Sequence, residues 1–175
     1  EGAMMKAVRS IEMKLTSMIM PKLQKLSDDE IRARVGRIDD ERLFAICEAL
    51  RRGIMTIDEI FEVTKIDRWF LHGFQKIVDM EKALASAGTI TKELYLRAKK
   101  MGFLDRTIEE LSGKSVKDVA RLPVYKTVDT CAAEFEAETP YYYSTFDEES
   151  ETKPSTGKKK VMVLGSGPIR IGQGI

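Results

Sequence analysis

The chain has 175 residues, of which 43% are hydrophobic and 33% charged, an ordinary balance for a globular protein that buries a core. Its 29 basic and 28 acidic side chains leave a net charge of +1, so no overall positive field would attract nucleic acid or an anionic membrane. Two cysteines and one histidine exclude a disulfide framework, a Cys-only zinc site and a His-rich metal cluster. No apolar run approaches the roughly 18 residues of a membrane span. We therefore expect a protein of the reducing cytoplasm with no membrane partner.

Residues 1–20 carry a single apolar stripe. Its members are spaced by four, three, four and three positions, namely Met4, Val8, Ile11, Leu15 and Met18. This spacing predicts one amphipathic helix, which Pro21 ends. No capping residue precedes the stripe, so the chain is expected to open inside a helix.

Residues 21–124 are predicted to form a small helical domain. Ser/Thr-x-x-Glu capping boxes, which satisfy the free N–H groups at a helix start, begin at Ser27, Thr56 and Thr107. Four glycines stand where helices would stop in the left-handed conformation, namely Gly53, Gly88, Gly102 and Gly113. We predict about seven helices up to Leu122, with Pro123 closing the region.

Residues 125–157 are predicted to form an extended connector. The segments 124–128 (VYKTV) and 141–143 (YYY) have strand propensity. Acidic residues at 147–151 and the KPSTG run at 153–157 are typical of an exposed linker.

Residues 158–175 are predicted to open an α/β domain. Val161 to Leu164 are apolar without alternation, as in a strand buried on both faces of a parallel sheet. Too few residues follow to complete a βαβ unit, so we expect a segment excised from a longer chain. The loop that follows contains Gly165, Gly167, Arg170, Gly172, Gln173 and Gly174.

This glycine loop has two interpretations. Glycines after a buried strand, with an arginine nearby, suit close approach to an anion, but a merely tight strand–helix turn would use the same residues. The spacing matches neither the dinucleotide fingerprint nor the P-loop. A dinucleotide enzyme would also need an acidic residue about 20 positions beyond the glycines, which this chain lacks.

Residues 56–76 permit a helix-turn-helix interpretation, with donors on the second helix at Arg68, His72, Gln75 and Lys76. That helix also carries several large apolar residues, and acidic residues precede it, so plain helix packing is favoured over a nucleic-acid-binding module. His72 has no evident carboxylate partner and Cys131 no base. Cys131 is predicted to be a buried structural thiol, and no catalytic or metal-binding constellation is expected.

A domain without catalytic groups most simply acts as a spacer and a contact surface. The helix predicted over residues 68–87 carries Trp69, Phe70 and Leu71 on adjacent faces. These residues exceed what one core-facing stripe uses, so this helix is our candidate for a self-association surface.

Four ordered motifs carry a resemblance to a known family. EGAMMKAVRSIE at 1–12, DERLFAICEALRRGIMTIDEIFEVTKIDRWFL at 40–71, VDTCAAEFEAETPYYYST at 128–145 and VMVLGSGPIRIGQGI at 161–175 resemble the centre of the carbamoyl-phosphate synthase large chain. The first is similar to the last helix of the first synthetase half. The second is similar to the helical oligomerisation domain, and the last to the opening of the second half.

The resemblance implies a mainly α segment: a small helical domain, an extended connector and the first β-strand of a truncated α/β (pre-ATP-grasp) domain. The parent ligase makes carbamoyl phosphate from bicarbonate, ammonia and two ATP, for arginine or pyrimidine biosynthesis. Its partners would be the rest of the large chain, a glutaminase small subunit and further copies. ATP with Mg or Mn would bind in other segments, which leaves this one non-catalytic. Arg170, Gly172, Gln173 and Gly174 would lie at the carbamate site or passage, after a phosphate-loop-like turn at Gly165 and Gly167.

Overall fold

The computed structural model describes residues 1–175 except 12, 137–140, 153–156, 158, 160 and 163–175. The described residues are mainly helical and contain one two-stranded sheet, which confirms the predicted fold class. The elements in chain order are α1 (Gly2–Ser10), the 3-10 helix η1 (Leu23–Lys25), α2 (Asp28–Gly36), α3 (Arg42–Arg52), α4 (Ile57–Thr64), α5 (Arg68–Ala85), α6 (Lys92–Lys100), α7 (Asp105–Ser112), β1 (Val124–Thr127) and β2 (Tyr142–Thr145).

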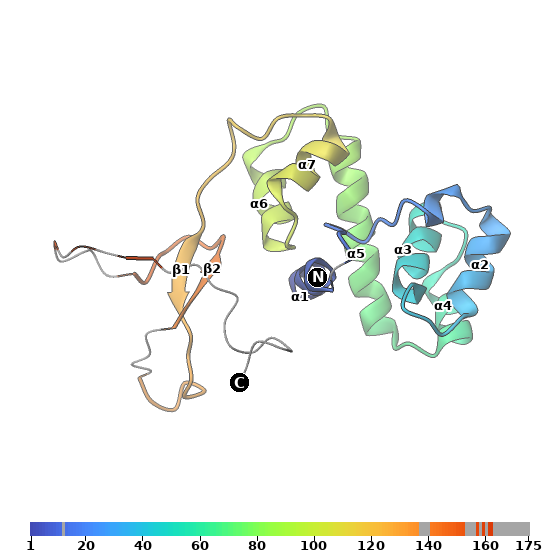
Figure 1. Ribbon diagram of the computed structural model, residues 1–175, viewed down its shortest axis with the longest axis horizontal. Helices are drawn as coiled ribbons and strands as arrows, with labels where there is room; N and C mark the ends of the chain where they lie inside the picture. Colours follow the sequence, from blue (N-terminus) through green and yellow to red (C-terminus); the bar gives the residue numbers. More distant parts are fainter. Residues whose placement is uncertain (12, 137–140, 153–156, 158, 160, 163–175) are drawn as a thin grey trace.

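The longest helix, α5, runs through the middle of the helical region (Figure 1). Helices α2, α3 and α4 lie on one side of it, and α1, α6 and α7 lie on the other. Its buried positions are spread over more than one stripe: Leu71, Phe74, Ile77, Val78, Met80, Glu81 and Leu84. A helix with apolar residues on two sides is buried between neighbours, so α5 joins the two helix groups into one core.

Capping boxes at Ser27 and Thr56 begin α2 and α4 as predicted. The Ser27 and Thr56 backbone N–H groups each donate to a glutamate carboxylate three residues on, at 2.7 Å. The box predicted at Thr107 is wrong, because α7 begins two residues earlier and Thr107 is buried inside it. The packing of Phe103, which is also buried, fixes where this helix starts more strongly than the local capping preference does.

Left-handed glycines end α3 and α7 as predicted, at Gly53 (φ 68°) and Gly113 (φ 64°). Gly102 follows α6 at φ 89°. The prediction for Gly88 is wrong, because α5 ends at Ala85 and its cap, Ser86, is right-handed. Gly88 does not have a positive φ.

The single helix predicted over residues 1–20 is wrong. Helix α1 ends at Ser10, and the chain then reaches α2 through a strap, residues 11–27 apart from residue 12, which is not described. The strap contains the short 3-10 helix η1, and Lys14 in it has a positive φ of 56°. Met18 and Met20 are both buried although they are two positions apart, which one helix face does not allow. Packing against the other helices therefore overrides the local helical stripe.

The two strands predicted in the connector pair with each other. β1 and β2 form an antiparallel hairpin in which Val124 lies opposite Thr145. The Arg121 guanidinium donates to the carbonyl oxygens of Phe146 and Asp147, each at 2.5 Å. The Phe146 ring packs edge-on against Tyr95 of α6, with 6.5 Å between ring centroids. These contacts hold the hairpin on the helices.

The predicted α/β opening lies almost entirely outside the described residues. Of the strand predicted at 161–164, only Val161 and Met162 are described; they are 88% and 83% exposed and belong to no strand. The whole glycine loop, Gly165, Gly167, Arg170, Gly172, Gln173 and Gly174, lies outside this range. Among the helices that are described, none combines the length and apolar character needed to cross a membrane.

Candidate functional site

The largest exposed aromatic residues of the helical domain lie at the start of α5. Trp69 is 75% exposed and Phe70 is 57% exposed, whereas Leu71 is fully buried. Two of the three residues of the candidate contact surface are thus exposed, whereas Leu71 belongs to the core; that Trp69 and Phe70 mediate self-association stays a prediction. Trp69 and Phe70 border a groove of about 310 Å³ between α5 and α1. We call it the aromatic groove; its apolar lining is Met4, Trp69, Phe70, Gly73, Phe74 and Ile77.

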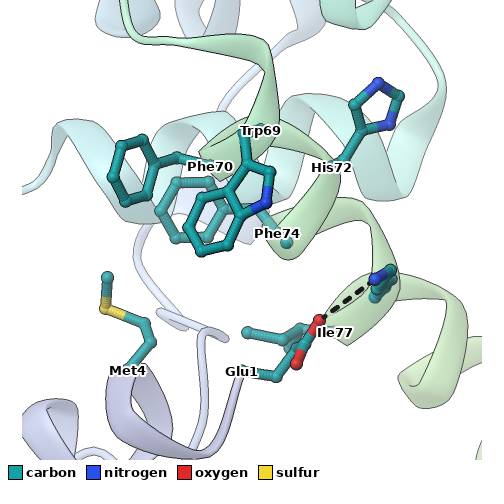
Figure 2. Close-up of a pocket in the computed structure, with 9 residues that line it drawn as sticks. Glu1, Met4, Trp69, Phe70, His72, Phe74 and Ile77 are labelled. Atoms are coloured by element: carbon teal, nitrogen blue, oxygen red, sulfur yellow. Dashed lines mark ion pairs between the residues drawn. The ribbon is translucent and has the colours of Figure 1, made fainter.

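The two exposed rings form a fixed pair. Their centroids are 5.0 Å apart and their planes are nearly perpendicular, at 89°, a favourable edge-to-face arrangement. The Asp67 carboxylate caps α5 by accepting from the Trp69 N–H at 2.7 Å. A Cβ added at Gly73 would meet nothing within 4 Å. Figure 2 shows the rings of Trp69, Phe70 and Phe74 on the side that faces Met4, with His72 pointing away.

The rim of the aromatic groove is polar and close to neutral. Glu1 of α1 and Lys76 of α5 form an ion pair at 3.7 Å, drawn as a dashed line in Figure 2. Arg68 donates to Asp58 of α4 at 2.6 Å and its guanidinium stacks over the Phe61 ring at 3.7 Å. Lys76, the lysine that lines the groove, thus has a carboxylate partner, as does Arg68, the residue before Trp69.

The donors of the helix-turn-helix hypothesis are therefore largely occupied. Arg68 and Lys76 have the partners just described, and the Gln75 side-chain amide donates to Asp79 at 2.7 Å. Phosphate and base contacts need free donors at the surface of the second helix. Only His72 of the four is without such a partner among the described residues.

A buried charge network, which sequence analysis missed, lies where α3 meets α5. Glu48 and Glu81 are 4% and 3% exposed. The Arg51 guanidinium donates to Glu81 at 2.7 and 2.9 Å and also contacts Glu48. Burial raises the pKa of Glu81, although the Arg51 charge opposes it. Burial likewise raises the pKa of the neighbouring Cys47 thiol, so this cysteine is a poor nucleophile.

Arg52 extends this network to the strap. Its guanidinium donates to the carbonyl oxygens of Leu23, Gln24 and Leu26 at 3.2, 3.1 and 2.8 Å, and it pairs with Glu48 at 2.9 Å. One side chain thus satisfies three backbone acceptors of an irregular segment. The role of this network is structural, because its carboxylates are bound by arginines inside the protein.

A second, basic cavity separates α1 from the hairpin. It encloses about 620 Å³, and Lys6, Arg9, Lys99 and Lys100 face Thr145 and Phe146 across it. Arg9 donates to the Gly102 carbonyl at 2.8 Å, Lys99 to Asp105 at 2.8 Å, and Lys100 pairs with Asp147 at 3.7 Å. Its charges thus hold α1, α6 and the hairpin together.

Cys131 is not the buried thiol that was predicted. It is half-buried in a turn where Asp129 accepts from its backbone N–H at 2.9 Å. The sulfur lies 3.9 Å from the Thr130 hydroxyl. Across the described residues, no three His, Cys, Asp or Glu side chains gather as a metal site would require.

Comparison with known proteins identifies the family. The family model described as "Carbamoyl-phosphate synthetase large chain, oligomerisation domain" matches residues 1–126. The chain belongs to the carbamoyl-phosphate synthase large-chain family. Residues 21–124, predicted to be a small helical domain, fall inside the matched region. The comparisons do not support the nucleic-acid-binding alternative.

Members of the carbamoyl-phosphate synthase family match along the whole chain. A carbamoyl phosphate synthase large chain of Lachnoclostridium phytofermentans is 54% identical over 100% of it, and one of Methanothrix thermoacetophila is 49% identical. An arginine-specific large chain of Halalkalibacterium halodurans is 46% identical, again over 100%. The chain spans 17% of the length of the first two relatives and 18% of the third.

Proposed function

We propose that this chain is the central segment of a carbamoyl-phosphate synthase large chain, where it joins the two synthetase halves and mediates self-association. The observation that supports this most directly is the match of an oligomerisation-domain model to residues 1–126. In the proposal, the whole enzyme is a cytoplasmic ligase that makes carbamoyl phosphate from bicarbonate, ammonia and two ATP. A glutaminase small subunit supplies the ammonia.

The segment itself is proposed to be non-catalytic. Its buried carboxylates, Glu48 and Glu81, are bound by Arg51, and its buried thiol, Cys47, has a raised pKa. The described residues do not fit an ATP–metal site, since they hold no group of three metal-ligating side chains. In the proposal, ATP with Mg or Mn binds in other segments of the enzyme, as the family resemblance implies, and no chemical step is assigned here.

The glycine loop is proposed as this segment's contribution to a substrate site. Arg170, Gly172, Gln173 and Gly174 would contact carbamate or line its passage, after the turn at Gly165 and Gly167. An arginine beside backbone N–H groups suits a small carboxylate-like anion. The site would be completed by residues of the second synthetase half.

The proposal is tested on the 175-residue segment by sedimentation velocity over a range of concentrations and by an ammonia-dependent synthesis assay. We expect self-association that grows with concentration, and no carbamoyl phosphate. A segment that stays monomeric at every concentration contradicts the oligomerisation role. Synthesis by the segment alone contradicts the non-catalytic role.

A further inference from the structure

The aromatic groove is not explained by the packing of the described residues. Side chains as large as tryptophan are mostly buried in folded proteins, yet Trp69 is 75% exposed. The neighbouring ring of Phe70 is 57% exposed. Two adjacent exposed rings beside an open groove are a feature of docking surfaces.

The rings are also held in place before any partner binds. The Asp67 cap fixes the backbone at Trp69, and the perpendicular contact with Phe70 orients both rings. A ring contact that already exists reduces the rotamer freedom lost on binding, which favours affinity. The space above Gly73 is open, so the groove needs no rearrangement to accept an apolar side chain.

We infer that the aromatic groove docks the part of the same large chain that precedes α1, that is, the first synthetase half. The inference rests on the proposed function. Glu1, where α1 begins, lies on the rim of the groove and pairs with Lys76 there. The relatives matched over the whole of this chain are far longer, since it spans 17% of their length. Under the proposed function, the first synthetase half is joined to α1 at Glu1, which lines the groove.

A covalent tether decides between this occupant and a second copy. A short tether gives a partner an effective concentration on the order of millimolar, far above the concentration of free copies at micromolar protein. A second copy would also have to cover a standard interface of roughly 800 Å² per partner. The groove itself offers six apolar lining residues, fewer than the roughly 20–30 residues per side of such an interface. The attached first synthetase half is therefore favoured over a second copy as the occupant of the groove.

The chemistry of the groove defines the docking segment. Its walls are Met4, Trp69, Phe70, Phe74 and Ile77, which suit aliphatic or aromatic side chains. Its rim cations are matched by carboxylates, so an anionic partner gains no free positive charge. We therefore expect a short, uncharged, apolar loop or helix end of the first half to insert beside Trp69.

Hydroxyl-radical footprinting with mass spectrometry tests whether the first synthetase half covers the aromatic groove. Oxidation of Trp69 is measured in the 175-residue segment and in the full-length large chain, each over a dilution series. If the ring becomes fully buried, as at the centre of well-packed interfaces, its oxidation falls roughly tenfold in the full-length chain and does so at every concentration. Ile38, which is 90% exposed and outside the groove, serves as the internal reference.

Two outcomes overturn the inference. If Trp69 is protected only as concentration rises, and in the isolated segment too, a second copy occupies the groove. If Trp69 stays reactive in the full-length chain, nothing occupies it. Either result leaves the proposed function standing, because that depends on sedimentation and the synthesis assay instead.

A substitution provides a second, independent readout. Trp69→Ser is expected to leave the melting temperature of the segment unchanged but to lower that of the full-length chain. The matched substitution Ile38→Ser, at another exposed apolar residue, should lower neither. Equal losses from Trp69→Ser in the segment and the full-length chain would assign Trp69 to the segment's own packing and contradict docking.

Discussion

At the scale of single residues, Arg51 is the most consequential side chain in the helical domain. It satisfies two carboxylates that are almost without solvent, Glu48 and Glu81. Even so, one oxygen of Glu81, Oε1, is buried without a hydrogen-bond partner among the described residues. A buried charge of this kind is tolerated only while its partner remains.

Replacement of Arg51 is therefore expected to be costly. Arg51→Ala should lower the free energy of unfolding by about 3–5 kcal/mol, because buried Glu81 loses its arginine partner and Glu48 keeps only Arg52. Arg106→Ala is the matched control: Arg106 pairs with Glu110 on the surface, and its loss should change stability by less than about 0.5 kcal/mol. Urea unfolding followed by circular dichroism measures both. Equal effects would show that the network at Arg51 contributes no more than a surface pair.

At the scale of elements, α1 packs closely against the turn after α6. A Cβ added at Gly102 would lie 3.1 Å from Met5 Cβ and 3.3 Å from Gly2 Cα. Gly102 also has a φ of 89°, which side-chain-bearing residues rarely adopt. Only glycine lets α1 lie this close to α6.

The close contact at Gly102 can be tested against Gly113, a glycine without close neighbours. Gly113 has a positive φ as well, but a Cβ there would meet nothing within 4 Å. Gly113→Ala should therefore cost only the left-handed backbone penalty, about 1–2 kcal/mol. Gly102→Ala should cost roughly a further 1–3 kcal/mol from overpacking, and amide hydrogen exchange in α1 should speed up. If the two variants are equally stable, α1 yields to the added methyl group without cost.

Local sequence patterns predicted where helices and strands lie better than they predicted which residues pack against one another. Ser27 and Thr56 mark helix starts because a capping box is decided within four residues. The strap at 11–27 was missed because its course depends on Arg52, which lies far along the chain and binds its carbonyl groups. Arg51 and Glu81 are 30 positions apart, so no local sequence pattern predicts that they form an ion pair.

In the aromatic groove, too, local patterns predicted some of the residues and missed those that tertiary packing brings in. Composition and spacing identified an excess of apolar residues on the helix after Asp67, and two of them, Trp69 and Phe70, are exposed. They did not show that Leu71 faces the core, since three adjacent apolar residues leave the orientation of the stripe open. Groups on α1, such as Met4 and Glu1, complete the groove, and their position follows only from the tertiary fold.

At the scale of the whole molecule, the β1–β2 hairpin is joined to the helices through few contacts. Phe146 packs against Tyr95, and the Lys99 ammonium lies 5.0 Å from the Phe146 ring centroid. Arg121 binds the backbone at the end of β2. An isolated two-stranded hairpin is marginally stable in water, so its order depends on this attachment.

Phe146→Ala should therefore release the hairpin and leave the helices folded. We expect amide hydrogen exchange of β1 and β2 to rise toward that of an unfolded peptide, while the helical melting temperature hardly changes. Phe135→Ala, at a phenylalanine that is 76% exposed, is the control and should change neither. A cooperative loss of helix in Phe146→Ala would show instead that hairpin and helices fold as one unit.

The basic cavity is lined by two segments that lie far apart in the sequence. Lys6 and Arg9 of α1 line the same cavity as Thr145 and Phe146 at the end of β2, so the end of the hairpin lies beside α1. In topological terms the helices are an insertion with adjacent ends, the arrangement that tolerates domain insertion and removal best.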